Sequence, residues 1–512
     1  MNQRVGDGLL IDSSQEIGFQ FNGREMRGHP GDTLASALLA NGQRMVGRSF
    51  KYHRPRGIVA SGAEEPNALL GIGRGPRFEP NQRATTTELF DGLEAQSQNH
   101  WPSLEFDVGA INASVANVAP VFSAGFYYKT FMFPKIAWKH VYEPFIRQAA
   151  GLGKAPSEAD ADTYEHFHIN TDVLVIGGGI AGILAAKAAA ESGAQVMLVE
   201  QAAHWGGRSL TDCGLIGGKS APEWIATEIS RLGALPNVRL RTRCMGAGLY
   251  DHGYAMLYER VSDHAPEGTA PRHRLWRVRA EQIIVASGAI ERPLTFAYND
   301  VPGVMLASAV RDYLGLYGVA PGRSLVLAAN NDDAYRTALA MHHAGLSVEA
   351  VVDIRRSVTG ALPQAVREAG IRVLPGHGIA KVHGKTEVQS VEVGRLSGSG
   401  RLLGGTEKIY CDLVAMSGGW SPVVHLFSHC GGKLRWDEAN TMFRPAPERA
   451  APLGHDGEIN TRCAGAANGA LDTTECIADA LNAGAAATGG KAKVKPPKTD
   501  APEEAPIEPH WF

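Results

Sequence analysis

Residues 171–200 read TDVLVIGGGIAGILAAKAAAESGAQVMLVE and carry the strongest structural signal in the chain. Val173–Ile176 is a short apolar run typical of a buried parallel strand, and three glycines follow it directly. An alanine-rich pattern then predicts a helix to about Ser192, and Val196–Val199 predicts a second strand. Strand, glycine-rich turn, helix and strand in this order predict a βαβ unit of the Rossmann type.

Each glycine of this turn has a separate task in that interpretation. Gly177 makes the tight turn, Gly179 lets a pyrophosphate approach the backbone, and Gly182 lets the helix pack closely on the strand. The helix N-terminus presents free N–H groups and the positive end of its dipole to the phosphates. Glu200 ends the second strand, where its carboxylate can accept hydrogen bonds from an adenosine ribose. The pattern predicts a dinucleotide site; the alternative is a glycine-rich turn that binds no ligand.

Composition gives the class of protein and excludes several functions. The chain has 512 residues, 44% hydrophobic and 20% charged, which is ordinary for a globular protein of several domains. A net charge of −3 gives no electrostatic reason to expect nucleic acid. The N-terminus lacks a signal pattern and no apolar run is long enough to span a membrane. We therefore expect a cytoplasmic protein that contacts neither nucleic acid nor membrane.

The six cysteines show no metal-binding or disulfide pattern. They are Cys213, Cys244, Cys411, Cys430, Cys463 and Cys476. No pair has the CxxC spacing, and none lies near the N-terminus, which argues against a zinc site, an iron–sulfur cluster or a disulfide framework. We expect buried, reduced thiols and no metal site.

Residues 1–94 are predicted to form a ferredoxin-like β-grasp domain without a cluster. Ile17–Phe21 alternates in polarity and meets Asn22-Gly23, a strong hairpin signal. Thr33 then caps a helix that continues to Ala40. A cluster-binding ferredoxin carries cysteines in the following loops, where this chain has 60-ASGAEEPN-67.

The segment 48-RSFKYHRPRG-57 is unusually rich in positive charge. Its cationic side chains are those of Arg48, Lys51, His53, Arg54 and Arg56. Two interpretations stay open. The loop binds a flavin phosphate, which suits a bidentate arginine, or its charges pair with the protein's own acids, Glu64 and Glu65 among them.

Residues 95–167 are an aromatic-rich connecting segment. Its aromatic residues are Phe122, Phe126, Tyr127, Tyr128, Phe131, Phe133, Trp138 and Tyr142. We expect an interdomain packing surface, with a ring-stacking site as the alternative. A polar linker, 154–162, leads into the βαβ unit.

The rest of the chain predicts a two-domain FAD/NAD(P)-binding fold. Residues 168–322 and 412–488 form the dinucleotide-binding domain, with a second glycine pair before Arg208 and a return strand that ends at 287-SG-288. Residues 323–411 repeat the strand–turn–helix–strand plan, but the glycines are replaced by 329-ANNDDA-334. Side chains there block the pyrophosphate, and Asp332 and Asp333 repel it, so we expect the fold without its nucleotide. Residues 489–512, rich in Pro, Lys, Glu and Ala, predict a disordered tail.

Several motifs together resemble the α subunit of heterotetrameric sarcosine oxidase. They are RSFKYHRPRG (48–57), NHWPSL (99–104), GFYYKTFMFP (125–134), AAGLG (149–153), VIGGGIAG (175–182), SGAIERP (287–293), NNDDAYR (330–336) and AGAANGA (464–470). The resemblance implies a cluster-free β-grasp domain and one nicotinamide dinucleotide on the first Rossmann unit. It also implies amine oxidation on FAD in a β subunit, FMN between α and β, and further small subunits in a hetero-oligomer.

The resemblance includes one departure. Family α subunits usually continue into a folate-binding aminomethyltransferase-like domain, whereas this chain stops in the preceding linker, as in a short form. Shorter relatives include the α subunits of opine oxidases and proline-type dehydrogenases, which often carry iron–sulfur cysteines.

These observations predict the dinucleotide-binding subunit of a flavin-dependent secondary-amine oxidase or dehydrogenase. We place no catalytic residue in this chain. Cofactor contacts to NAD, or alternatively FAD, are predicted for Gly177, Gly178, Gly179, Ile180, Ala181, Gly182, Glu200, Gly207, Arg208, Ser287, Gly288 and Asn468. The main alternative is a self-contained NAD(P)H-dependent flavoprotein reductase, which would need a CxxC pair or an intact second glycine motif.

Overall fold

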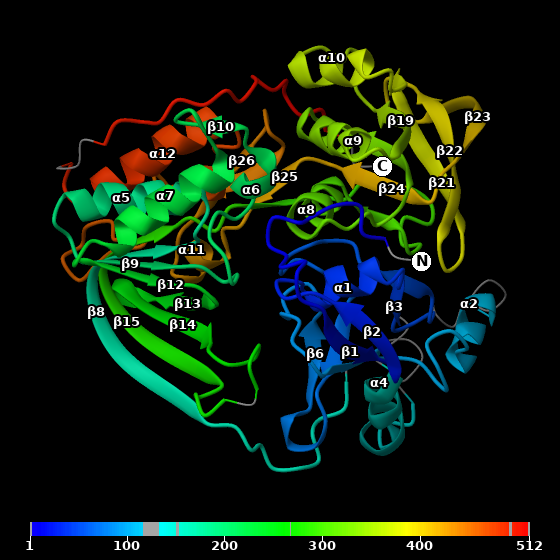
Figure 1. The fold of residues 1–512 in the computed structure, drawn as a ribbon, viewed down its shortest axis with the longest axis horizontal. Coiled ribbons are helices and arrows are strands. Elements are labelled where there is room, and N and C mark those ends of the chain that lie inside the picture. Colours follow the sequence, from blue (N-terminus) through cyan, green and yellow to red (C-terminus); the bar gives the residue numbers. More distant parts are fainter. Residues whose placement is uncertain (1–2, 116–132, 150–152, 267, 491–493, 510–512) are drawn as a thin grey trace.

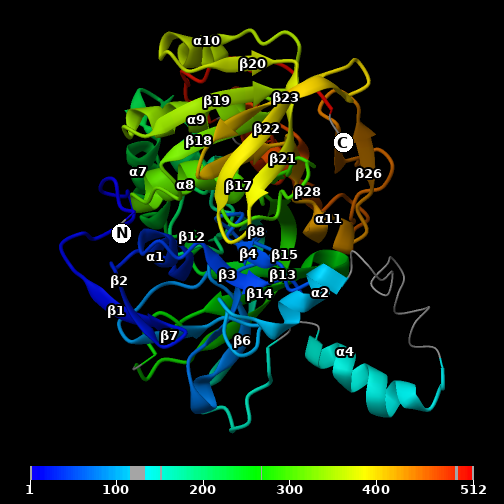
Figure 2. The ribbon, with the colours of Figure 1, turned by 90° about the vertical axis from the view of Figure 1, so that its right-hand side faces the viewer.

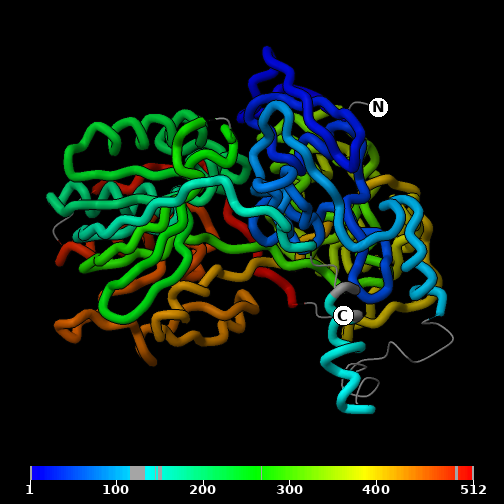
Figure 3. The backbone as a smooth tube through the Cα atoms, turned by 90° about the horizontal axis from the view of Figure 1, so that it is seen from below, coloured from blue at the N-terminus to red at the C-terminus, as the bar shows by residue number. Residues whose placement is uncertain are grey.

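The structure is a computed structural model that describes residues 3–115, 133–149, 153–266, 268–490 and 494–509. Seen from below, it has two lobes (Figure 3). The first Rossmann domain forms one lobe, and the N-terminal domain together with the second Rossmann-like domain forms the other. In the described residues, no helix is long and apolar enough to cross a bilayer. The motif 125–134 lies largely outside the described residues.

The N-terminal domain has the predicted β-grasp arrangement. Its mixed sheet has the order β2-β1-β7-β5-β6, and β7 runs parallel to β1. The strands are β1 (Ile17–Phe21), β2 (Arg24–Gly28), β5 (Leu69–Ile72), β6 (Glu79–Arg83) and β7 (Leu93–Gln96). Asn22 and Gly23 both adopt positive φ in the β1–β2 turn, as a two-residue hairpin loop requires. Helix α1 (Leu34–Ala40) begins at Thr33, whose side chain forms a capping box with Ser36.

The first Rossmann domain is built on parallel strands in the order β12-β9-β8-β15, with β28 beside β15 (Figure 1). Its strands are β8 (Tyr164–Ile176), β9 (Val196–Val199), β12 (Val238–Arg241), β15 (His273–Val285) and β28 (Thr461–Cys463). The N-terminal half of β15 also pairs with an antiparallel meander of β13 (Cys244–Tyr250) and β14 (Tyr254–Arg260).

Helix α5 (Ile180–Glu191) connects β8 to β9, as the sequence predicts. It packs against α12 (Thr473–Ala486), and both helices are rich in alanine. A side chain at Gly484 would collide with the Ala185 carbonyl of α5, so the small residues set the close approach of the two helices. The remaining elements of this lobe are α6 (Ser209–Asp212), α7 (Ala221–Gly233), β10 (Leu215–Ile216) and β11 (Lys219–Ser220).

The second Rossmann-like domain has a five-stranded parallel sheet with the order β17-β24-β18-β19-β20. Its strands are β17 (Val304–Leu306), β18 (Ser324–Ala329), β19 (Ser347–Asp353), β20 (Val373–Pro375) and β24 (Leu413–Ser417). Its helices are α8 (Ala307–Tyr317), α9 (Asp333–His343) and α10 (Ala361–Glu368). An antiparallel sheet of β21 (His377–Gly384), β22 (Val388–Leu396) and β23 (Leu402–Tyr410) lies beside it.

Two short antiparallel strands join the two Rossmann-type domains. They are β16 (Ala289–Glu291) and β25 (Trp420–Pro422), each directly after a return strand. The chain then forms α11 (His425–His429) and a hairpin of β26 (Leu434–Asp437) and β27 (Met442–Pro445) before it re-enters the first domain.

Residues 133–149 of the connecting segment do not pack between domains of this chain, whereas Leu104 is buried and Asp162 pairs with Arg77 and Arg272. Helix α4 (Glu143–Ala149) and the preceding turn of helix at Trp138–Tyr142 project from the body (Figure 2). Phe133 is 84% exposed, and Ile136, Trp138 and Val141 are also exposed. Trp101, Phe106 and Ile111, the last in α2 (Ile111–Val115), are exposed as well. The expected packing surface is therefore wrong for Phe133 and Trp138, because they lie on an extension with no core of this chain beneath it. Phe122, Phe126, Tyr127, Tyr128 and Phe131 lie outside the described residues.

The tail differs from the disordered linker that its composition predicts. Residues 494–509 form no helix or strand, but they run across α12 to the second domain (Figure 1). The Lys498 carbonyl accepts from the Gly217 amide at 2.7 Å, and the Asp500 carboxylate accepts from the Leu215 amide at 2.7 Å. Ala505 and Glu508 bond to the second domain. Composition misleads here because backbone hydrogen bonds, which any residue can form, hold the segment.

Candidate functional site

The glycine turn after β8 adopts the geometry that the sequence predicts. Gly177 has a φ of +113°, and a side chain there would collide with the Ala286 carbonyl. A side chain at Gly182 would collide with the Gly177 carbonyl, so this glycine lets α5 approach the strand. At Gly179, by contrast, an added Cβ would meet only the Gly206 carbonyl oxygen, at 3.8 Å. The protein leaves the space at Gly179 open, as the approach of a pyrophosphate requires.

A second glycine pair lies against this turn. The Gly206 amide donates to the Gly178 carbonyl at 2.8 Å, and Gly179 and Gly206 pair as an isolated parallel bridge. Gly207 has a φ of +49°, and an added Cβ there would approach Gly179. Two glycine backbones therefore lie side by side at the N-terminus of α5 and form one surface free of side chains.

Glu200 follows β9 and is held in a defined orientation. Its Oε2 accepts from the Gly178 amide at 2.6 Å and its Oε1 from the Ala202 amide at 2.8 Å. Burial raises the pKa of Glu200, while the amide hydrogen bonds act in the opposite direction. Each carboxylate oxygen has a second lone pair, so both can still accept from ribose hydroxyls.

These groups line one large cavity of about 2340 Å³ between the three domains and the tail. Its volume exceeds that of a typical small-molecule pocket. The predicted residues in its wall are Gly177, Gly178, Gly179, Ile180, Ala181, Glu200, Gly207, Arg208, Ser287 and Gly288. Two predicted residues are outside the wall: Gly182, which lies in α5 against the Gly177 carbonyl, and Asn468, whose amide donates to Asp479 at 2.9 Å and holds the turn before α12.

Arg208 lies in the cavity wall with its charge already neutralised. Its guanidinium binds Asp212 with two hydrogen bonds of 2.9 Å and Asp312 with one of 3.1 Å, and it lies over the Trp420 ring. The two carboxylates raise the pKa of Arg208 against its burial. Arg208 therefore contributes an ion pair between domains, and a phosphate would have to compete with two carboxylates for it.

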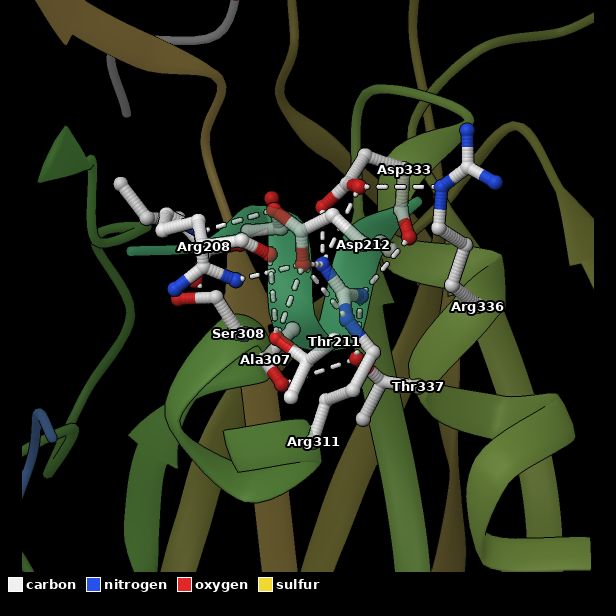
Figure 4. Close-up of polar contacts among 12 residues, drawn as sticks. Arg208, Thr211, Asp212, Ala307, Ser308, Arg311, Asp333, Arg336 and Thr337 are labelled. Atoms are coloured by element: carbon white, nitrogen blue, oxygen red, sulfur yellow. Dashed lines mark hydrogen bonds and ion pairs between the residues drawn. The ribbon is translucent and has the colours of Figure 1, made fainter. Parts of the chain in front are cut away.

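The network continues into the second domain (Figure 4) and from there to the tail. Asp212 lies between Arg208 and Arg311, and Arg311 also contacts Asp333. Arg336 then contacts both Asp333, at 3.2 Å, and Glu504 of the tail, at 2.5 Å. The neighbouring guanidiniums lower the pKa of Asp212 despite burial, whereas burial and Asp333 raise the pKa of Glu504 to about 7. The sequence missed this network, because Arg311 is 99 residues from Asp212 and no local pattern connects them.

The corresponding turn of the second domain is filled by the chain itself. Asn331 donates to Ser417 at 2.8 Å and accepts from the Ala334 amide. Asp332 accepts from the Ala505 amide at 2.9 Å and pairs with Arg355, and Asn330 exchanges two hydrogen bonds with Glu508. The tail therefore covers the position at which a second pyrophosphate would approach this fold.

The cationic loop joins β3 (Met45–Arg48) to β4 (Pro55–Gly57) and pairs with acids of this chain. Arg54 and Arg56 both bind Asp300, and His53 contacts Asp107 at 2.7 Å. These acids are not the ones that the sequence suggested. The Glu65 carboxylate instead accepts from four backbone amides, those of Val59, Ala60, Asn67 and Ala68.

Two family models match the chain. Residues 14–100 match the 2Fe-2S iron-sulfur cluster binding domain, and residues 171–442 match the pyridine nucleotide-disulphide oxidoreductase family. The first match stands against the expectation of a cluster-free domain. The donor set does not fit a cluster, however, because no cysteine occurs within residues 14–100 and cluster irons need thiolate ligands.

The chain is 46% identical to the sarcosine oxidase alpha subunit of Rhizobium meliloti (strain 1021) over 85% of this chain and 43% of that protein. It is 35% identical to the corresponding protein of Corynebacterium sp. (strain P-1) over 93% of this chain and 44% of that protein. It thus spans less than half the length of these relatives. One of the opine oxidase subunits of Rhizobium meliloti (strain 1021) is 27% identical over 54% of this chain and 62% of that protein.

Among solved structures, L-proline dehydrogenase from P. horikoshii has a similar fold. Its TM-score is 0.60 at 17% identity, and the match covers 94% of this chain and 74% of that chain. The glycine turn, the pair of Rossmann-type domains and the family match all indicate the same family of oxidoreductases. The chain belongs to the pyridine nucleotide-disulphide oxidoreductase family and is a homologue of sarcosine oxidase alpha subunits.

Proposed function

We propose that this chain is the dinucleotide-binding α subunit of a multi-subunit, flavin-dependent enzyme that oxidises secondary amines such as sarcosine-like N-alkyl amino acids. The observation that carries the proposal is the open backbone surface at Gly179 and Gly207, beside Glu200, in a chain 46% identical to a sarcosine oxidase alpha subunit. The chain spans 43% of that relative, and its own residues suggest no catalytic base or nucleophile. We place the oxidation of the amine in a partner subunit.

NAD, or alternatively FAD, binds the first Rossmann domain in this proposal. The adenosine ribose bonds to Glu200, the pyrophosphate lies on Gly179 at the N-terminus of α5, and the ring half lies toward Gly288 and the second domain. A nicotinamide or flavin ring supplies a hydride acceptor when bound. The second domain holds no dinucleotide, since its turn carries Asp332 and Asp333 and is covered by residues 505–508.

The partner is a flavin-containing β subunit, together with small subunits, and FMN lies at the interface. Exposed aromatic and aliphatic side chains on the extension at residues 133–141 support such an assembly. Exposed clusters of large apolar side chains mark interaction sites, because a lone soluble chain gains nothing by exposing them. The cationic loop stays a candidate for the FMN phosphate, although Asp300 and Asp107 already neutralise part of its charge.

The β-grasp domain holds no iron–sulfur cluster in this proposal, despite its match to the cluster-binding family. A [2Fe–2S] cluster takes four cysteine thiolates, or two with two histidines, and residues 14–100 contain no cysteine. A short core of β1, β7 and α1 with buried Phe19, Phe21 and Leu38 gives the domain its own hydrophobic support.

Two other functions stay open. A self-contained NAD(P)H-dependent flavoprotein reductase has the same pair of Rossmann-type domains, but the sequence lacks the CxxC pair of a disulfide reductase. The α subunit of an opine- or proline-type dehydrogenase is favoured by the fold of L-proline dehydrogenase and by the match to the opine oxidase.

Replacement Gly179→Val tests the dinucleotide site directly. Gly179 has an extended backbone, and its nearest neighbour to an added Cβ is 3.8 Å away, so the protein itself tolerates the side chain. We expect loss of bound dinucleotide, with a thermal stability equal to that of the cofactor-free wild type, because the valine occupies the pyrophosphate position. Gly405→Val, on exposed β23 with nothing near its Cβ, is the matched control. Full dinucleotide occupancy in Gly179→Val would refute the site.

Glu200→Ala should weaken dinucleotide binding by about 1–3 kcal/mol.

Metal analysis tests the cluster-free domain. We expect iron far below one atom per chain in protein purified without oxygen, because no thiolate ligand is present in residues 14–100. About two irons per chain, together with the visible absorption of a [2Fe–2S] cluster, would show that the family match describes the domain correctly.

Reconstitution tests the proposal that the chain works within a complex. The isolated chain should not turn over sarcosine, whereas co-expression with the flavin-containing partner should give an active complex. Trp138→Ser should weaken assembly, since this side chain is exposed on the extension, and Tyr410→Ser, 72% exposed on β23, is the control. Turnover by the isolated chain would contradict the proposal.

An unchanged FMN content in Arg54→Ala and Arg56→Ala complexes would assign the cationic loop a structural role.

A further inference from the structure

Glu291 is a buried carboxylate that no part of the proposed site uses. It is the last residue of β16, in the connection between the two Rossmann-type domains, and it is 5% exposed. Its Oε2 accepts from the Ser308 amide at 2.8 Å and so caps the first turn of α8. The residue before this helix, Leu306, has no side-chain acceptor to offer.

The other oxygen of Glu291 has no hydrogen-bond partner. Oε1 is buried in the wall of the central cavity and makes no hydrogen bond of normal geometry, although the Ser308 and Ser417 hydroxyls lie near the carboxylate and act to lower its pKa. Leaving a buried acceptor unpaired costs about 1–3 kcal/mol, more for a charged group. A protein rarely keeps such an atom unless a ligand or an ordered water satisfies it.

The wall of the cavity is continuous from the glycine turn to this oxygen. Residues 287–291 all line the cavity, and Gly288 has a φ of +73° with open space where a side chain would lie. Gly177 and Gly179 line the same cavity at the pyrophosphate position. A dinucleotide whose phosphates lie on Gly179 therefore directs its ring half along this wall, toward the second domain.

We propose that Oε1 of Glu291 accepts a hydrogen bond from the carboxamide N–H of the nicotinamide ring of NAD. This inference rests on the proposed function, because it needs a dinucleotide in the cavity. In this proposal Glu291 is a cofactor-binding residue. It contacts the nicotinamide half of NAD, whereas Glu200 contacts the adenosine half.

Charge at this end of the cavity favours an oxidised nicotinamide over a flavin. Asp212, Asp312 and Asp333 equal the guanidiniums of Arg208, Arg311 and Arg336 in number, and Glu291 and Glu504, whose pKa values are raised to about 7, add negative charge once they ionise. A pyridinium ring is positively charged and is stabilised by surrounding carboxylates. A flavin gains negative charge when it is reduced, so the same carboxylates oppose its reduction.

Competition binding with three ligands tests the inference. NAD carries the carboxamide, 3-acetylpyridine adenine dinucleotide replaces its NH₂ by a methyl group, and ADP-ribose lacks the ring. Measurements are made at about pH 8.5, because burial and Asp333 raise the pKa of Glu291 to about 7 and the carboxylate must be ionised. The affinity of each ligand is measured by competition with labelled NAD for the full-length chain. The variant is Glu291→Gln, whose side-chain carbonyl can still accept from the Ser308 amide.

The wild-type chain should bind NAD at least about 10-fold more tightly than the acetylpyridine analogue, since the analogue leaves Oε1 unpaired. Glu291→Gln should lose this preference, through weaker NAD binding, and bind ADP-ribose as the wild type does. Equal binding of NAD and the analogue by the wild type, or a preference kept in Glu291→Gln, would overturn the inference and leave Glu291 as a cap for α8.

Two further outcomes separate this inference from the proposed function. If the wild type binds ADP-ribose but holds FAD in preference to NAD, the dinucleotide site stands and the nicotinamide contact is refuted. If the wild type binds none of the three ligands, the proposed function fails, and the role of Glu291 with it.

Discussion

The peptide groups of Gly178 hold the site together. The Gly178 amide donates to Glu200 at the end of β9, and its carbonyl accepts from Gly206. These two hydrogen bonds join the first turn, the acidic residue and the second glycine loop into one unit. Because both partners bind backbone atoms, the surface facing the cavity stays free of side chains. The pyrophosphate contact that we propose depends on that bare surface.

The two Rossmann-type domains show how one fold serves two purposes. In the first, glycine leaves the helix N-terminus open; in the second, Asn331 and Asp332 close it with hydrogen bonds to Ser417 and to the tail. The turn to which we assign the phosphates in one domain anchors a peptide segment in the other. The ion pairs from Arg208 through Arg311 to Arg336 and Glu504 then connect the domains and the tail around the cavity.

Sequence patterns predicted what depends on neighbours along the chain. The hairpin at Asn22-Gly23, the cap at Thr33 and the βαβ unit around Gly177 all follow from local backbone requirements, and the structure has them at those positions. The missed features depend on distant partners. Asp300 neutralises Arg56 from 244 residues away, and Asp312 meets Arg208 from 104 residues away. The unpaired oxygen of Glu291 is likewise visible only once α8 is packed against β16.

The number and identity of dinucleotides per chain test the central claim, that one Rossmann-type domain binds a dinucleotide and the other does not. The protein is purified without added cofactor, denatured, and its released nucleotides are quantified by mass spectrometry against the protein concentration. Our account predicts about one dinucleotide per chain, as the single open glycine turn requires. Two per chain would contradict the assignment of the second domain, and none would contradict the site at Gly179.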